Sequence, residues 1–251
     1  MSDAELIARL RAAGCVFAEE EAAEIRRVRG DDAAAVEAVV LARTAGVPLE
    51  QALGVASFAG VEVGVAPGVF VPRARAEAIV DAAVAARPDA RIVVDLGCGA
   101  GAIAAALATR LPRAEVHAVD VDPAAVAVAA ENGARHRFSA HRGDWWTGLP
   151  AQLRGRIELA AAYLPHVPTR ELARIPRDFR EHEPEGAVHG GADGLDPFRA
   201  VLAGMEAWTA AGGAFVTLVA GEQVETARGL VGARPLEVLE VDDDAVLIVS
   251  R

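Results

Sequence analysis

A glycine cluster directly after a short apolar run constrains the fold of this chain more than any other feature. The apolar run is Ile92–Val94, and glycine then stands at positions 97, 99 and 101 before an alanine-rich segment. Glycine has no Cβ, so it tolerates positive φ and lets the backbone come close to a bound molecule. The pattern predicts a strand, a tight turn under a ligand and a helix.

The same strand and helix alternation continues along the chain. Further strands are expected at residues 115–120, 137–142, 157–162, 214–219, 236–241 and 245–251. Apolar strands alternating with helices predict an α/β fold with a Rossmann-like, mostly parallel sheet of seven strands. Only three residues, 242–244, join the last two strands, which is too short for a crossover, so the final strand is expected to be antiparallel.

The residues before this sheet have a different character. Apolar side chains recur at helical spacing in residues 1–55, which predicts a small helical N-terminal domain. Val61, Val63 and Val65 then alternate with other residues, and a turn at 66–68 leads to the apolar stretch 69–71, so residues 56–72 are expected to form a β-hairpin linker. Residues 73–251 are expected to form the catalytic domain.

Composition excludes several classes of function. The net charge of −11 disfavours sequence-independent binding to nucleic acid. No apolar run approaches the roughly 20 residues of a membrane span, and the first residues lack the features of a signal peptide. The chain has only two cysteines and no lysine, so we expect a cytoplasmic protein without a Schiff-base or phosphate-loop lysine.

Three acidic residues at successive strand ends identify the ligand. Asp95 precedes the first glycine, Asp120 ends the next strand, and Asp144 follows the third beside Trp145. Asp95 suits a cationic cofactor with an ammonium group, as in S-adenosylmethionine, Asp120 suits ribose hydroxyls, and Asp144 with Trp145 suits an adenine. Because strand ends meet at one edge of a parallel sheet, we expect these acids in one crevice with Gly97, Gly99 and Gly101.

Two other interpretations of the glycine cluster stay open. A dehydrogenase that binds a nicotinamide dinucleotide uses a similar turn, although its usual spacing is Gly-x-Gly-x-x-Gly and an acid at Asp95 would repel a pyrophosphate. The glycines could also serve only tight packing of strand against helix. His182 and His189 lie close to Glu181, Glu183 and Glu185, but their spacing matches no zinc or iron template, so we expect no metal site.

Further motifs resemble those of a known family. Four segments carry the resemblance: residues 46–54, 58–60, 67–73 and 183–195. The last of them contains Glu-Pro and, farther on, Gly-Gly-Ala-Asp-Gly-Leu. These segments are similar to those of the class I methyltransferases that modify release-factor glutamines. The resemblance covers nearly the whole chain. It implies an S-adenosylmethionine cofactor held by Asp95, Gly97, Gly99, Asp120 and Trp145, and it implies protein methylation.

The substrate motif departs from this family. Where the family has Asn-Pro-Pro-Tyr after its fourth strand, this chain has Tyr163, Leu164, Pro165 and His166. These four residues are the expected substrate contacts, and Tyr163 also falls beside the cofactor. The family asparagine and a proline carbonyl hold both N–H groups of the glutamine amide, and the single phenol of Tyr163 cannot hold both.

The sequence therefore leaves the methyl acceptor open. The resemblance implies a protein glutamine amide of a release factor, whereas the altered motif favours another nitrogen or oxygen nucleophile, including one on a small molecule. His166 and Tyr163 are the candidate catalytic residues, with His166 either a proton acceptor or a packing residue. A cofactor-binding module without catalysis is the remaining alternative.

Overall fold

The structure, a computed structural model, describes residues 1–251. Its α-helices are α1 (Asp3–Ala12), α2 (Ala18–Arg29), α3 (Ala33–Thr44), α4 (Leu49–Leu53), α5 (Glu77–Ala86), α6 (Ala102–Arg110), α7 (Pro123–His136), α8 (Arg177–His182), α9 (Asp196–Trp208) and α10 (Val224–Val231). Its strands are β1 (Val55–Phe58), β2 (Val61–Gly64), β3 (Ile92–Leu96), β4 (Glu115–Asp120), β5 (Phe138–Arg142), β6 (Ile157–Ala162), β7 (Thr209–Ala220), β8 (Leu236–Val241) and β9 (Asp244–Ser250).

Seven strands form one sheet in the order β5-β4-β3-β6-β7-β9-β8. The five strands from β5 to β7 in this order pair in parallel, and β9 is antiparallel to both of its neighbours. The predicted Rossmann-like sheet with an antiparallel final strand is confirmed. The final strand lies between β7 and β8, so β8, which precedes it in sequence, forms the edge of the sheet.

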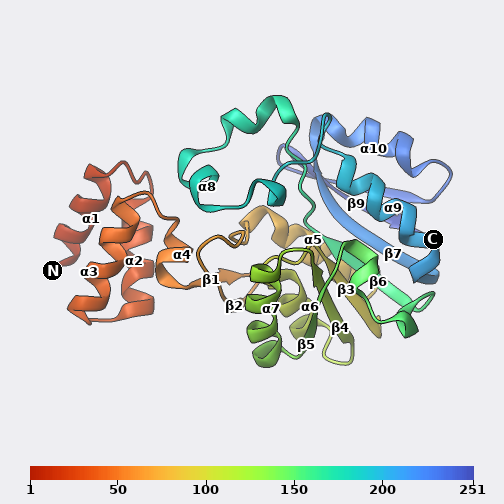
Figure 1. The fold of residues 1–251 in the computed structure, drawn as a ribbon, viewed down its shortest axis with the longest axis horizontal. Coiled ribbons are helices and arrows are strands. Elements are labelled where there is room, and N and C mark those ends of the chain that lie inside the picture. The colour runs from red at the N-terminus through yellow and green to blue at the C-terminus, as the bar shows by residue number, and fades with distance from the viewer.

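The sheet has a hydrophobic core on each face, with helices outside (Figure 1). One core joins α5, α6 and α7 to alternate strand residues such as Val93 and Val116. The other joins α9 and α10 to the intervening residues, such as Val94 and Val119. Because successive side chains of a strand point to opposite faces, strands that are buried on both sides are nearly all apolar. The centre of the sheet is therefore a rigid support for the loops at its edge.

The N-terminal helices α1, α2 and α3 lie apart from the sheet at the far end of the molecule (Figure 1). They share a core of their own, which includes Leu6, Leu10, Ile25 and Val40. The third helix begins after Asp32, whose side chain accepts hydrogen bonds from the N–H groups of Ala34 and Ala35. Whether this part is an independent domain stays a prediction. No helix of the structure has both the length and the apolar character that crossing a membrane requires.

The hairpin between the two parts differs from the predicted one. Its strands are β1 and β2, joined at Ala59 and Gly60, both of which have positive φ. The stretch 69–71, predicted as its second strand, is not a strand. Val69 and Val71 are buried, and the backbone N–H of Val71 donates to a side chain from the distant residue Glu183. The contact with Glu183 takes the place of hydrogen bonds to a neighbouring strand. No local sequence pattern could indicate a contact between residues so far apart.

Candidate active site

A cavity of about 260 Å³ opens at the carboxyl ends of the central strands. Asp95, Asp120, Asp144 and Trp145 line it from the ends of β3, β4 and β5. Strand β3 lies where the chain order of the sheet reverses, with β4 on one side and β6 on the other. Crevices at such switch points are the usual ligand sites of open α/β sheets. The structure thus brings the three strand-end acids to one cavity.

Asp95 is the most deeply buried acid of the cavity, with 1% of the residue exposed. One carboxylate oxygen, Oδ2, accepts a hydrogen bond of 3.0 Å from the backbone N–H of Ala104 in α6. The other, Oδ1, is buried without a partner. Burial raises the pKa of Asp95 from 3.8 to about 7, and the nearby charge of Asp120 adds to the rise. A buried carboxylate oxygen without a donor at a cavity wall is suited to a cationic group of a ligand.

The carboxylate of Asp120 accepts hydrogen bonds from the glycine turn and from the backbone that follows β4. Its Oδ2 accepts from the N–H of Gly99 at 2.8 Å, and its Oδ1 accepts from the N–H of Asp122 at 2.9 Å. Burial raises the pKa of this carboxyl, and the hydrogen bonds from the backbone oppose the rise. Each carboxylate oxygen can accept two hydrogen bonds and here accepts one, so the carboxylate retains acceptor sites for hydroxyl groups.

The third acid differs in its setting. Asp144 is exposed, and the next residue, Trp145, is partly buried with a φ of 47°. The ring of Trp145 lies so close to Gly97 that a Cβ there would come within 3.0 Å of it. Glycine at 97, which has a φ of 70°, therefore allows the indole to lie against the turn. This arrangement leaves a flat aromatic surface beside a carboxylate at the cavity.

Gly101, expected to contact the cofactor, does not line the cavity. It precedes α6 with a φ of 82°, and a Cβ there would lie 2.6 Å from the ring of Phe138. The structure thus gives this glycine a packing role at the start of the helix. Gly97, Gly99, Cys98 and Ala100 do line the cavity.

The loop after β6 divides the predicted substrate residues between the cavity and the protein interior. Tyr163 and Pro165 line the cavity. Leu164 is buried in the core under α9, with 3% exposed. His166 is partly buried and is not among the cavity-lining residues. The alternation arises because successive residues of an extended chain point in opposite directions.

The imidazole of His166 has a defined hydrogen-bond arrangement. Its Nδ1 lies 2.8 Å from the carbonyl oxygen of Leu164, which can only accept, so Nδ1 carries the proton and Nε2 carries the lone pair. The ring of Tyr163 lies beside that of His166, with 5.3 Å between the two ring centroids. Burial lowers the pKa of His166 and raises the pKa of the Tyr163 phenol. Both side chains are therefore neutral near pH 7. The role of His166 as a proton acceptor stays a prediction.

A buried ion pair that the sequence did not single out lies beside the cavity. The guanidinium of Arg73 contacts the carboxylate of Glu183 at 2.6 Å and lies over the rings of Phe70 and Phe179, at 4.5 and 4.0 Å from their centroids. Phe70 and Arg73 also line the cavity. This contact brings the linker and the segment 169–189 together at the cavity. Both residues stand in the family-like motifs, but nothing local indicates that they meet.

Two buried amides also connect distant segments. Gln51 in α4 donates from Nε2 to the carbonyls of Val69 and His182, which lie in the linker and at the end of α8. Asn132 in α7 donates from Nδ2 to the carbonyls of Gly64 and Ala100 and accepts from the N–H of Gly64. Asn132 is the only asparagine of the chain. Because all its contacts are with this backbone, it is not available to hold the amide of a substrate.

Comparison with known proteins agrees with this geometry. Residues 65–148 match the family model described as "Methyltransferase small domain". The release factor glutamine methyltransferase of Geobacter sulfurreducens is 35% identical over 202 residues, which cover 80% of this chain and 70% of that protein. The chain belongs to the release factor glutamine methyltransferase family. Another member of the family, from Gloeobacter violaceus, is 41% identical over 163 residues, which cover 62% of this chain and 56% of that protein.

Solved structures support the fold. The 16S rRNA N2 G1207 methyltransferase of T. thermophilus, in complex with AdoMet and guanosine, matches with a TM-score of 0.56 at 21% identity. The match covers 78% of this chain and 49% of that one. Membership in a methyltransferase family decides against the dehydrogenase alternative. The chain is thus an S-adenosylmethionine-dependent methyltransferase by family.

Proposed function

We propose that the cavity binds S-adenosylmethionine and that the chain transfers its methyl group to a nucleophile held at Tyr163 and Pro165. The observation that carries this proposal is the unpartnered, buried Oδ1 of Asp95, a residue that lines the same cavity as Asp120 and Trp145. The cofactor has a cationic amino group, two ribose hydroxyls and a flat adenine. Asp95 therefore matches the amino group, Asp120 matches the ribose hydroxyls, and the indole of Trp145 matches the adenine.

Each of these residues has a distinct task in the proposed site. The carboxylate of Asp95 accepts from the ammonium of the cofactor, and that of Asp120 accepts from the ribose hydroxyls while its bonds to the turn keep it in place. Trp145 provides a stacking surface, and Asp144 an acceptor for the adenine amino group. When bound, the cofactor supplies a methyl group on a sulfonium, which a nucleophile attacks in line. The contribution of the protein is mainly positioning.

A glutamine amide of a release factor is the first acceptor to test, because the family acts on it by name. The two N–H groups of a primary amide need two acceptors to turn the nitrogen lone pair toward the methyl group. In this chain the phenol oxygen of Tyr163 can provide one. The only asparagine, Asn132, is fully engaged elsewhere.

The phenol of Tyr163, on a rigid ring in place of the family's asparagine amide, favours another candidate acceptor. A nitrogen or oxygen nucleophile with a single proton, on a protein or a small molecule, needs only one acceptor beside the aromatic ring of Tyr163. Incubation of the purified protein with cofactor labelled in the methyl group and with cell extract separates the two possibilities. Label in a release factor supports the family substrate, label in another protein or in small molecules supports the other acceptor, and no label supports a module without catalysis.

Cofactor binding tests the first part of the proposal directly. We expect Asp120→Ala to weaken the binding of S-adenosylhomocysteine by roughly 1–3 kcal/mol in calorimetry, because the ribose would lose a charged acceptor. Asp120→Asn retains one oxygen and is expected to weaken binding less. Asp89→Ala, at an exposed residue away from the cavity, is the matched control. Equal affinity in all three variants would show that Asp120 does not bind the cofactor.

We also propose a cytoplasmic location and a separate N-terminal domain over residues 1–55. Both cysteines, Cys15 and Cys98, are free and buried, which fits a reducing compartment. The N-terminal helices have their own core. Fractionation of cells tests the first proposal, and deletion of the helices, described in the Discussion, tests the second.

A further inference from the structure

Gln223 lies in the short turn that follows β7, and its side-chain amide is buried, with 4% of the residue exposed. Its Oε1 accepts a hydrogen bond of 3.0 Å from the backbone N–H of Ala220. Its Nε2 donates to the carbonyl of His166 at 2.9 Å and to the carbonyl of Asp193 at 3.0 Å. A side-chain amide has two N–H donors, so both donors of Gln223 are used.

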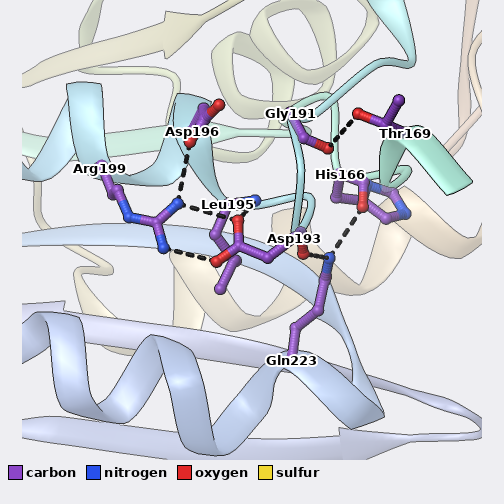
Figure 2. A network of polar contacts seen from close by, with 8 residues as sticks. All are labelled: His166, Thr169, Gly191, Asp193, Leu195, Asp196, Arg199 and Gln223. Atoms are coloured by element: carbon purple, nitrogen blue, oxygen red, sulfur yellow. Dashed lines mark hydrogen bonds and ion pairs between the residues drawn. The ribbon is translucent and has the colours of Figure 1, made fainter.

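The two carbonyls belong to segments that are distant in the sequence. His166 lies in the loop after β6, which carries Tyr163 and Pro165 on the cavity wall. Asp193 lies in the glycine-rich turn 190–195. Figure 2 shows the side chain of Gln223 extending from the turn after β7 toward both carbonyls. One residue near the end of β7 therefore holds both segments.

The loop and the turn are also bonded to each other through their backbones. The N–H of Gly190 donates to the carbonyl of Val167, the N–H of Val167 donates to the carbonyl of Val188, and the N–H of Thr169 donates to the carbonyl of Gly191. These bonds of 2.9 to 3.0 Å make the two segments a single unit. Gln223 connects that unit to the turn after β7.

The close approach of the three segments depends on a glycine. A Cβ at Gly194 would lie 2.2 Å from Nε2 of Gln223 and 2.2 Å from the carbonyl oxygen of His166, and Gly194 has a φ of 81°. On the other side, the carboxylate of Asp193 pairs with the guanidinium of Arg199 at 2.6 Å, which restrains the turn from α9 (Figure 2). Gly194 thus allows the close approach of the His166 carbonyl to Gln223, and Arg199 restrains the turn that carries the Asp193 carbonyl.

We propose that Gln223 is a positioning residue for methyl transfer, which fixes the loop after β6 so that Tyr163 and Pro165 meet the acceptor in line with the cofactor. This inference rests on the proposed function. Gln223 does not line the cavity, so it acts through the loop and not on the reacting atoms. Without its two donors, the partly buried carbonyls of His166 and Asp193 lose their side-chain partner, and the loop is free to shift toward other donors.

The test compares four variants. Gln223→Leu keeps the approximate size of the side chain and removes all its hydrogen bonds. Gln223→Glu keeps the acceptor for Ala220 and supplies at most one donor. Gln152→Leu and Gln152→Glu make the same changes at an exposed glutamine and are the matched controls. For each variant we measure cofactor affinity, thermal unfolding, amide hydrogen exchange and the kinetics of methyl transfer.

Hydrogen exchange with S-adenosylhomocysteine bound is the readout that needs no methyl acceptor. We expect faster exchange confined to residues 163–169 and 188–195 in both Gln223 variants, with the greater effect in Gln223→Leu. Exchange in β3 and β4 should match the parent protein. Unchanged exchange in the two segments would overturn the proposal, and so would a uniform increase over the sheet, which would show a purely structural role.

Kinetics then test positioning with whichever acceptor the labelling experiment identifies. We expect kcat to fall on the order of 10- to 100-fold, because small displacements of reacting groups have effects of this size. Cofactor affinity should stay within about two-fold of the parent protein, because the site of change is outside the cavity. A loss of cofactor affinity in parallel with kcat would contradict the proposal. If the parent transfers no methyl group at all, the proposed function fails and the positioning role fails with it, and hydrogen exchange then decides only whether Gln223 fixes the loop.

Discussion

The guanidinium of Arg73 and the carboxylate of Glu183 form an ion pair of 2.6 Å between residues that are 110 positions apart. The Glu183 side chain is 2% exposed, and its second oxygen, Oε1, accepts from the N–H of Val71 at 2.9 Å. Burial raises the pKa of Glu183, and the charge of Arg73 opposes that rise. Together with the bond from Val71, the pair joins the end of the linker to the segment that contributes Pro184 to the cavity wall.

Removal of one partner of this pair should destabilise the protein. We expect Arg73→Met to lower the free energy of unfolding by roughly 2–4 kcal/mol, because the buried carboxylate of Glu183 loses its counter-charge. Arg73→Met combined with Glu183→Gln should recover part of the loss. Urea denaturation measures both, with Arg113→Met as control, since the pair of Arg113 with Asp89 is exposed. An effect no larger than that of the control would show that the pair contributes little.

Cofactor binding should release a proton through Asp95. Its pKa of about 7 in the free protein lies above the ordinary 3.8, so stability from this group is present at low pH and is lost as pH rises toward 7. A bound ammonium favours the ionised carboxylate, so affinity should rise with pH up to about 7. Calorimetry at pH 6 in buffers of different ionisation enthalpy should show release of close to one proton. Asp95→Asn should release none, and equal release by both proteins would exclude this group.

Deletion of the N-terminal helices should separate cofactor binding from control of the segment around α8. We expect proteins that lack residues 1–47 or 1–55 to fold and bind the cofactor, because Asp95, Asp120 and Asp144 lie beyond both deletions. Only the longer deletion removes Gln51, which donates to the carbonyl of His182. Trypsin should therefore cleave near α8 faster in the longer deletion than in the shorter one. Loss of cofactor binding in a folded deletion would show that the helices help to form the cavity.

The replaced motif should limit methylation of a release-factor glutamine. We expect little glutamine methylation by the parent protein and more, on the order of 100-fold, by Tyr163→Asn combined with Leu164→Pro and His166→Tyr. Because Leu164 is in the core, Tyr163→Asn alone is tested as a milder variant. Tyr163→Phe, which keeps the ring, is the control and should restore nothing. Mass spectrometry of the release factor measures each, and robust methylation by the parent would refute the prediction.

Much of the fold can be predicted from the sequence because the signals are local. Apolar runs, glycine turns and caps such as Asp122 before Pro123 define most strands and helices. The boundaries of β7 are less clear. It begins at Thr209, before the predicted 214, because its first residues pair with β6 across a shift in register near Ile157. The position of β9 inside the sheet is also a long-range property.

The candidate site divides in the same way. Asp95, Asp120 and Asp144 are predictable because strand ends of a parallel sheet converge. The positions of Gly101 and His166 outside the cavity wall are not predictable. Gly101 packs against the ring of Phe138, and His166 is held by its hydrogen bond to the carbonyl of Leu164. Gln51 and Gln223 escape prediction for another reason. Glutamine is mostly found on the surface, so a buried glutamine is not expected from the sequence. Its backbone partners, which lie many positions away, become known only from the structure.

The place of β9 between β7 and β8 affects the order in which the chain can fold during its synthesis. Residues 236–241 leave the ribosome before residues 244–250, yet β8 has no neighbour in the sheet other than β9. Until Ser250 has emerged, β7 therefore remains an open, apolar edge that can pair with other chains. The nascent protein is expected to be most prone to aggregation over this interval, although its cavity-forming strands β3, β4, β5 and β6 are already complete.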